Sequence, residues 1–279
     1  MSDAGPPQDA KASPKGSAVQ GVASVGADPD WPYPRWIAHR GAGKLAPENT
    51  LAAFRFGAGH GYRMFECDVK LAADGVPFLM HDATLGRTTN GCEIFGRAAS
   101  DVGGDHAWSE LAKLDAGGWH SRAFAGEPLP TLENISRYCL ANGHALNIEI
   151  KPTPGVERRT GEVVARHADR LWNNAPIPPL LTSFRPEALE GAKATATRLP
   201  RGLLLDTLWD GWLDQATALD CVAIVCNHAL WDAATVAQVH GAGMKCLSYT
   251  VNDPWAAERL IQLGTDGIIT DRVDLFSPM

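Results

Sequence analysis

The 279-residue sequence lacks any apolar run of the roughly 18 residues that a bilayer-spanning helix needs. It also lacks an excess of positive charge, because 25 lysines and arginines stand against 32 acids and give a net charge of −7. This balance argues against nucleic acid or an anionic membrane as the main partner. None of the six cysteines lies in a CxxC pair, so no disulfide framework is expected. We therefore expect a soluble cytoplasmic protein.

The motifs of several common enzyme classes are also missing. The sequence contains no GxxxxGK[ST] and no GxSxG motif, which excludes P-loop and serine-hydrolase chemistry. No GxGxxG motif opens a helix after a strand, so a dinucleotide-binding domain is not expected either.

Residues 1–30 contain no Leu, Ile or aromatic residue and are rich in Ala, Gly, Pro, Ser and Asp. They have neither the positive start nor the apolar stretch of a signal peptide. Such a segment buries too little apolar surface to offset the entropy of ordering, so we predict a disordered N-terminal tail over 1–30. The remaining residues, 31–279, match the length of about 250 residues that a (β/α)8 barrel typically takes.

Short β-rich runs alternate with amphipathic helical runs through residues 31–279, which predicts an α/β fold with a parallel sheet. We expect a (β/α)8 TIM barrel. The predicted strands are 36–39, 64–71, 76–81, 146–151, 180–184, 202–205, 222–226, 246–251 and 267–270. The predicted helices are 49–60, 132–142, 158–172, 186–193, 212–219, 233–240 and 254–262.

The nine predicted strands exceed the eight of a barrel, and the second and third runs explain the surplus. Only four residues separate Leu71 from Val76, too few for a parallel connection, so these runs form an antiparallel hairpin. A four-residue turn would place Glu66 opposite His81, and a two-residue turn would place Asp68 there. Either register brings His81 beside the acidic pair.

Residues 83–130, after this hairpin, are weakly regular, with a single short helical pattern near 109–114. A stretch of this length inside a domain predicts a small functional insertion. It would lie at the carboxyl ends of the strands, where barrel active sites are found.

Glu66 and Asp68 lie two residues apart in a strand and therefore share one face. A divalent cation would relieve their mutual repulsion, and their hard oxygen atoms suit Mg²⁺ or Ca²⁺. A salt-bridged structural pair is the alternative interpretation. Cys67 points to the opposite face, where we expect it to pack.

Asn147, Glu149 and Lys151 alternate with isoleucines, so their side chains also share one face of a strand. A lone Glu–Lys pair is usually a structural ion pair. If this strand lies near Glu66 and Asp68, however, Glu149 completes a three-carboxylate cation site.

His39-Arg40 ends the first strand, where barrels place their active sites, although a solvated surface pair would give the same pattern. Gly41 and Gly43 permit a tight turn after it. Asn49 precedes an apolar helical run and is predicted as its N-cap.

His81-Asp82 ends the hairpin. Asp82 could orient His81, but neighbouring residues rarely share a side-chain hydrogen bond within a strand.

Taken in order, these motifs resemble the glycerophosphodiester phosphodiesterases. The start Trp31-Pro32-Tyr33-Pro34-Arg35, with Gly202-Leu203-Leu204-Leu205-Asp206, is similar in particular to the bacterial cytoplasmic type associated with glycerol-3-phosphate uptake. The matching segments are His39-Arg40-Gly41, Pro47-Glu48-Asn49-Thr50, Glu66-Cys67-Asp68, His81-Asp82, Arg87-Thr88, Glu149-Ile150-Lys151, Thr250-Val251-Asn252 and Gly267-Ile268-Ile269-Thr270-Asp271. The resemblance implies a phosphodiesterase barrel that hydrolyses glycerophosphodiesters to sn-glycerol 3-phosphate and an alcohol.

The resemblance also implies the role of each site residue. Glu66, Asp68 and Glu149 would bind the divalent cation, and Arg40 and Lys151 would hold the substrate phosphate. His39 and His81 would form the acid/base pair, with His39 favoured as the base. Phe184 and Tyr249 would contact the substrate, although the family often has tryptophan where this sequence has Tyr249.

Two alternatives stay open at this point. A lysophospholipase D or sphingomyelinase D on a related barrel would act on substrates that carry acyl chains. A non-catalytic protein that binds phosphate esters would use the same pocket. The sequence indicates neither the head group of the substrate nor the oligomeric state.

Overall fold

Eight parallel strands close into a barrel in the computed structural model, which describes residues 31–96 and 101–278. They are β1 (Trp36–Ala38), β2 (Met64–Leu71), β4 (Ala145–Ile150), β5 (Leu180–Ser183), β6 (Arg201–Leu205), β7 (Cys221–Asn227), β8 (Lys245–Tyr249) and β9 (Gly267–Thr270). Their order is β1-β9-β8-β7-β6-β5-β4-β2, and pairing of β1 with β2 closes the ring. The predicted TIM barrel is therefore confirmed, and the predicted tail at 1–30 lies outside the described residues.

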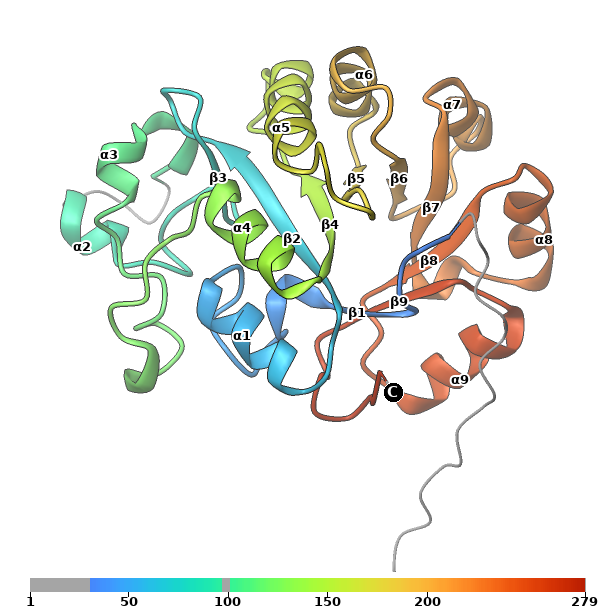
Figure 1. Ribbon diagram of the computed structural model, residues 1–279, viewed down its shortest axis with the longest axis horizontal. Coiled ribbons are helices and arrows are strands. Elements are labelled where there is room, and N and C mark those ends of the chain that lie inside the picture. Colours follow the sequence, from blue (N-terminus) through green and yellow to red (C-terminus); the bar gives the residue numbers. More distant parts are fainter. Residues whose placement is uncertain (1–30, 97–100, 279) are drawn as a thin grey trace, which may run out of the picture. The chain divides into compact units, whose positions relative to one another are not determined.

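Helices follow most of the strands and lie outside the ring of strands, as Figure 1 shows. They are α1 (Leu51–Gly59), α4 (Leu132–Asn142), α5 (Glu157–Leu171), α6 (Pro186–Thr195), α7 (Trp212–Ala218), α8 (Ala233–Gly241) and α9 (Pro254–Leu263). Each predicted helix is present, with ends that differ by up to two residues. Within the part of the chain that the structure describes, no helix combines the length and the apolar character needed to cross a membrane.

The hairpin of β2 with β3 (Pro77–Leu79) has a register that differs from both predicted ones. Leu71 pairs with Pro77, and the Ala72 amide donates to the Val76 carbonyl, so three residues, 73–75, form the turn. The ladder ends where the Met80 amide donates to the Asp68 carbonyl, and His81 follows in a bend. His81 therefore pairs with neither Glu66 nor Asp68 in the ladder, and it reaches the acids from the loop instead.

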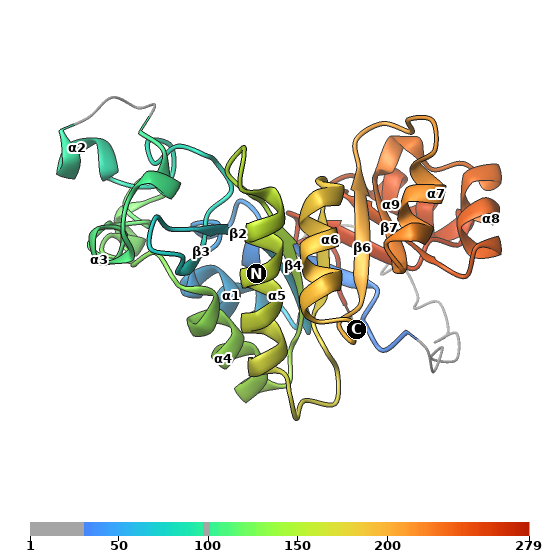
Figure 2. The ribbon, with the colours of Figure 1, turned by 90° about the horizontal axis from the view of Figure 1, so that it is seen from above.

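Two short helices, α2 (Gly91–Phe95) and α3 (Trp108–Leu111), lie between β3 and α4 together with the 3-10 turns Gly103–Asp105 and Arg122–Phe124. Figure 2 shows them beside β3, on the far side from α7 and α8. Buried side chains such as Phe78, Leu85 and Leu111 form a small core there. The predicted short helical pattern near 109–114 corresponds to α3, whereas α2 was not predicted.

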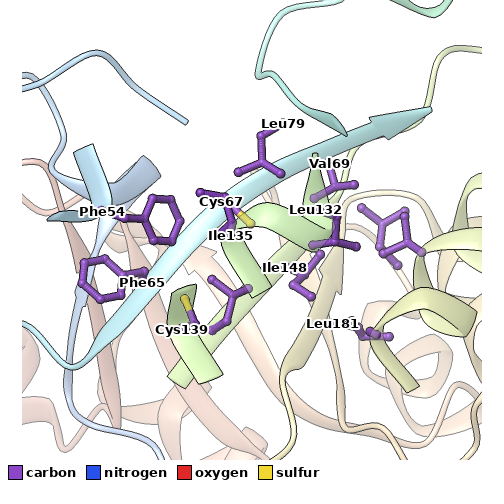
Figure 3. Packing of buried hydrophobic residues seen from close by; sticks show 14 of the residues in the cluster. Phe54, Phe65, Cys67, Val69, Leu79, Leu132, Ile135, Cys139, Ile148 and Leu181 are labelled. Carbon is purple, nitrogen blue, oxygen red and sulfur yellow. The ribbon is translucent and has the colours of Figure 1, made fainter. Parts of the chain in front are cut away.

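Alternation along β2 separates the packing face from the polar face. Phe65, Cys67 and Val69 are fully buried in the apolar layer between the barrel and helices α1 and α4, drawn in Figure 3. Ile148 of β4 points into the same layer. The predicted packing role of Cys67 is confirmed, and the opposite face of β2 is left for charged side chains.

Candidate active site

A cavity of about 190 Å³ brings together most of the residues that the sequence singled out. The strands and loops around it contribute side chains from the carboxyl ends of the strands, the predicted face of the barrel. Eight of the nine predicted site residues line it, namely His39, Arg40, Glu66, His81, Glu149, Lys151, Phe184 and Tyr249. The ninth, Asp68, is buried beside the cavity in contact with Arg40 and Lys151.

The three predicted carboxylates converge because β2 and β4 are neighbours. Their parallel register places Asp68 beside Glu149 and Glu66 beside Asn147. One carboxylate oxygen from each of Glu66, Asp68 and Glu149 lies within 4.8 Å of the others. All three side chains are buried.

Negative charge is in excess at this cluster. Burial and the neighbouring charge of Asp68 raise the pKa of Glu66 to about 8. The same two effects raise the pKa of Glu149. One carboxylate oxygen of Glu66, Oε1, is buried without a hydrogen-bond donor. A buried acid with a free oxygen and two acidic neighbours fits a divalent cation with oxygen ligands.

Two cationic side chains border the carboxylates. Lys151 Nζ lies 2.9 Å from Glu149 Oε1 and 3.3 Å from Asp68 Oδ1, and Arg40 Nε lies 3.2 Å from Asp68 Oδ2. Although burial opposes ionisation, these cations hold the pKa of Asp68 well below its usual range. Asp68 is therefore ionised, and Lys151 and Arg40 bring positive charge to the wall of the cavity.

Asn49 orients Asp68 and does not cap a helix as predicted. Its amide donates to Asp68 Oδ2 at 2.8 Å, and its carbonyl oxygen accepts from the Asp68 backbone amide at 3.0 Å. Asn49 has a φ of 60°, a left-handed conformation that asparagine tolerates better than most residues. The N-cap of α1 is Thr50, whose side chain accepts from the Ala53 amide.

His39 forms a hydrogen bond with an acid from the other end of the chain. Its Nδ1 lies 2.6 Å from Oδ1 of Asp271, which follows β9, and β9 pairs with β1. Asn252 donates to the other oxygen of Asp271 at 2.9 Å. Burial lowers the pKa of His39, but the bond to Asp271 and the charge of Glu66 outweigh it, so that the pKa is raised.

The turn after β1 makes this contact possible. Gly43 has a φ of +59°, and a Cβ atom there would lie 2.3 Å from the Cα and carbonyl oxygen of Asp271. Only glycine lets the two segments approach this closely.

His81 has its own carboxylate partner, the adjacent Asp82. The imidazole Nδ1 lies 2.8 Å from Asp82 Oδ1. Our expectation that neighbours rarely form such a bond applied to a strand, and His81 lies in a bend beyond β3. Burial lowers the pKa of His81; the charge of Asp68 opposes this, but Arg40 and Lys151 lower it further.

Phe184 and Tyr249 form an aromatic wall of the cavity. Their ring centroids lie 5.7 Å apart at a steep angle, and Lys151 Nζ lies 5.9 Å from the Phe184 centroid. The Tyr249 hydroxyl donates to the Leu205 carbonyl, which fixes the ring.

His240, Cys246 and Asp266 form a second cluster of metal-ligating residue types within the described residues. It lies near the start of β8 and β9, the opposite end of the barrel. Oδ2 of Asp266 already accepts hydrogen bonds from the Cys246 amide and His240 Nε2. These bonds give the cluster a structural explanation.

The sequence interpretation named no role for Asp271, Asn252 or Glu48. Each follows the carboxyl end of a barrel strand, so position alone was a usable signal. The pairing of Asp271 with His39 depends on barrel closure, which the sequence does not display locally.

Sequence similarity to known proteins extends over the whole site. The model of the glycerophosphoryl diester phosphodiesterase family matches residues 39–275, which include every site residue named above. The chain belongs to this family. The membership confirms the predicted resemblance and the prediction of a glycerophosphodiester phosphodiesterase enzyme.

Individual members of the family match most of the chain. A putative glycerophosphodiester phosphodiesterase of Bacillus subtilis, YhdW, is 32% identical over 85% of this chain and 94% of its own length. A glycerophosphodiester phosphodiesterase of Caldanaerobacter subterraneus is 34% identical over 84% and 93%. The structure of an Oleispira antarctica phosphodiesterase in complex with the product sn-glycerol-3-phosphate has a TM-score of 0.77 and 32% identity, and covers 85% of this chain and 93% of that one.

Proposed function

We propose that the protein hydrolyses glycerophosphodiesters to sn-glycerol 3-phosphate and an alcohol, with a divalent cation and two histidines as the acid and the base. The observation that carries this proposal is that three clustered, buried carboxylates, two of them lining the cavity, lie with two cavity-lining histidines that each have a carboxylate partner. The product bound to the Oleispira antarctica relative supports the substrate class. The net charge of −7 favours small soluble substrates over nucleic acid, and we place the activity in the cytoplasm.

Glu66, Asp68 and Glu149 would hold the cation. Their oxygen atoms favour Mg²⁺ or Ca²⁺ over zinc, which prefers nitrogen and sulfur. When bound, the cation supplies positive charge to the phosphoryl oxygens of the substrate. Binding would also offset the repulsion that raises the pKa of Glu66.

Arg40 and Lys151 would bind the substrate phosphate. Both side chains line the cavity, and both are already held close to Asp68. Groups fixed in advance stabilise the charge of a transition state without reorganising during the reaction. Phe184 and Tyr249 would pack against the glycerol or the head group from the opposite wall.

We assign His39 as the base and His81 as the acid. In each, a carboxylate at Nδ1 leaves Nε2 for proton transfer. The environments of the two rings favour the reverse protonation, because the bond to Asp271 and the charge of Glu66 raise the pKa of His39 against burial, whereas burial lowers that of His81. Glu66 contributes to the higher pKa of His39, and a cation on Glu66 would offset that contribution.

The choice of leaving group tests these roles. A p-nitrophenyl phosphodiester of glycerol releases an alcohol that needs no proton, whereas glycerophosphocholine needs an acid. His81→Ala should lose about 10²-fold or more in kcat with glycerophosphocholine and much less with the nitrophenyl ester. His39→Ala should lose similarly with both substrates. The opposite pattern would reverse the two roles, and normal turnover in both variants would reject them.

The cation is tested by exhaustive treatment with EDTA. Activity toward glycerophosphocholine should disappear and should return with Mg²⁺ or Ca²⁺. Full activity of the treated enzyme would contradict the carboxylate site. Lysophosphatidylcholine assayed in parallel distinguishes this function from that of a lysophospholipase D.

A further inference from the structure

Arg87 lies between two carboxylates that belong to different loops. Its Nε and Nη2 donate to the two oxygens of Asp82 at 2.7 and 3.0 Å. Its Nη1 and Nη2 donate to the two oxygens of Glu48 at 2.8 and 2.7 Å. Both edges of the guanidinium group are thus used in paired hydrogen bonds, a geometry that lysine cannot reproduce.

Each of these carboxylates also contacts a residue that we place in the active site. Asp82 Oδ1 lies 2.8 Å from Nδ1 of His81. Glu48 Oε1 accepts from Nη1 of Arg40 at 2.9 Å. Arg87 therefore connects the loop that carries His81 with the loop that carries Arg40. In the chain, Arg87 is 39 residues away from Glu48.

The positive charge of Arg87 stabilises the ionised forms of Glu48 and Asp82. Burial raises the pKa of Glu48, but the bonds to Arg87 and the charge of Arg40 outweigh it and lower the pKa. The hydrogen bond from Arg87 is also the main cause that lowers the pKa of Asp82. Without Arg87, Asp82 could rotate away from His81, and Glu48 would keep Arg40 as its remaining guanidinium partner.

Arg87 also lies against an aromatic side chain. The ring of Trp119 lies 6.0 Å from its guanidinium carbon, and the indole nitrogen of Trp119 donates to the Ala116 carbonyl. The Arg87 side chain is 44% exposed, whereas those of Glu48 and Asp82 are 13% and 26% exposed. Its four hydrogen bonds fix the orientation of these two carboxylates, each of which contacts a residue of the active site.

We propose that Arg87 is a positioning residue that holds His81 and Arg40 in their reactive orientations through Asp82 and Glu48. The proposal rests on the function proposed above, because it needs His81 and Arg40 to act on the substrate. It assigns to Arg87 no contact with the substrate.

The test compares Arg87→Met and Arg87→Lys with a matched control, Arg137→Met. Arg137 also donates two hydrogen bonds to one carboxylate, Glu133, but lies exposed on α4. With glycerophosphocholine, Arg87→Met should lower kcat roughly ten- to a hundredfold, as expected for misplaced catalytic groups. Arg87→Lys should have a kcat between those of Arg87→Met and the wild type, and Arg137→Met should keep the wild-type kcat. All three should melt within a few degrees of the wild type.

Two further measurements separate positioning from a merely structural role. With the nitrophenyl ester, the loss in Arg87→Met should shrink, because the part that depends on His81 is no longer needed. Arg87→Met should lower kcat less in the Asp82→Asn background than in the wild type. The reason is that Arg87 acts on His81 through Asp82, so the two substitutions remove the same interaction.

A wild-type kcat in Arg87→Met would overturn the proposal. So would a combination of two results: an equal loss of kcat with both esters, and effects of Arg87→Met and Asp82→Asn on kcat that are fully additive. If Arg87→Met fails to fold, Arg87→Lys decides: a lower kcat at an unchanged melting temperature supports the proposal, and an unchanged kcat overturns it. An active wild type with an inactive His81→Ala variant keeps the proposed function intact in either case. A wild type inactive on every glycerophosphodiester would reject both.

Discussion

Replacing Asp271 with asparagine should disable His39 without changing the shape of the site. Asn252 Nδ2 donates to Oδ2 of Asp271, so the oxygen of the new amide must stay on that side. Its NH₂ group would then face Nδ1 of His39, which now lies 2.6 Å from a carboxylate oxygen. The imidazole would have to accept at Nδ1 and carry its proton on Nε2, which is the wrong tautomer for a base.

The size of the effect follows from the bond that is lost. A hydrogen bond to a charged group contributes about 1.5–3 kcal/mol, and each 1.36 kcal/mol changes a rate tenfold. Asp271→Asn should therefore lower kcat on glycerophosphocholine by roughly ten- to 150-fold. Because Asp271 raises the pKa of His39, the substitution should also move the acidic limb of the kcat/KM profile to lower pH.

Asp274→Asn is the matched control for this experiment. Asp274 is an exposed acid three residues away, with its hydrogen bonds to Arg272. It should keep the wild-type kcat and pH profile. If Asp271→Asn stays within twofold of the wild type in kcat, the reasoning about the His39 tautomer is wrong.

Three more substitutions test the support of the site. Asn49→Gly keeps the left-handed backbone but removes both hydrogen bonds to Asp68, and should lower the free energy of unfolding in urea by about 2 kcal/mol; an unchanged midpoint would contradict this. Gly43→Ala should push Asp271 away from His39 and lower kcat at least tenfold; a kcat equal to the wild type would mean that the segments move apart freely. Ile148→Ala should lower the free energy of unfolding in urea by about 2–5 kcal/mol, because this side chain packs against the helices. The folded variant should keep the wild-type kcat, and a large loss of kcat would contradict this.

The strands were predictable because each is a short β-rich run between helical patterns or turns, nearly continuous in apolar residues where both faces are covered. The ranges of β2 and β9 match the predicted ones, and Glu66 and Asp68 share the polar face as expected. The ends of the other strands differ from the predicted ones by at most two residues. Pairing with a neighbouring strand decides those ends, and that information lies outside the strand itself.

The wrong predictions concern positions where the local sequence pattern favoured one structure and contacts with distant residues favoured another. Asn49 is a good N-cap residue, but Thr50 next to it is also one, and the contact with Asp68 decides between them. Leu71 of the hairpin pairs with Pro77, so neither predicted register is right. Helix α2 was missed in the weakly regular stretch 83–130, where the only predicted helical pattern is the one that corresponds to α3.

The two histidines obtain their carboxylate partners in different ways, and this difference has consequences. His81 bonds to its neighbour Asp82, so its orientation depends on the loop and on Arg87. His39 bonds to Asp271, 232 residues away, and the two meet only because β1 pairs with β9. A substitution that loosens the closure of the barrel should therefore impair His39 and leave the His81–Asp82 pair intact. Damage to the loop after β3 should do the reverse, so the two halves of the proposed acid/base pair can be disabled separately.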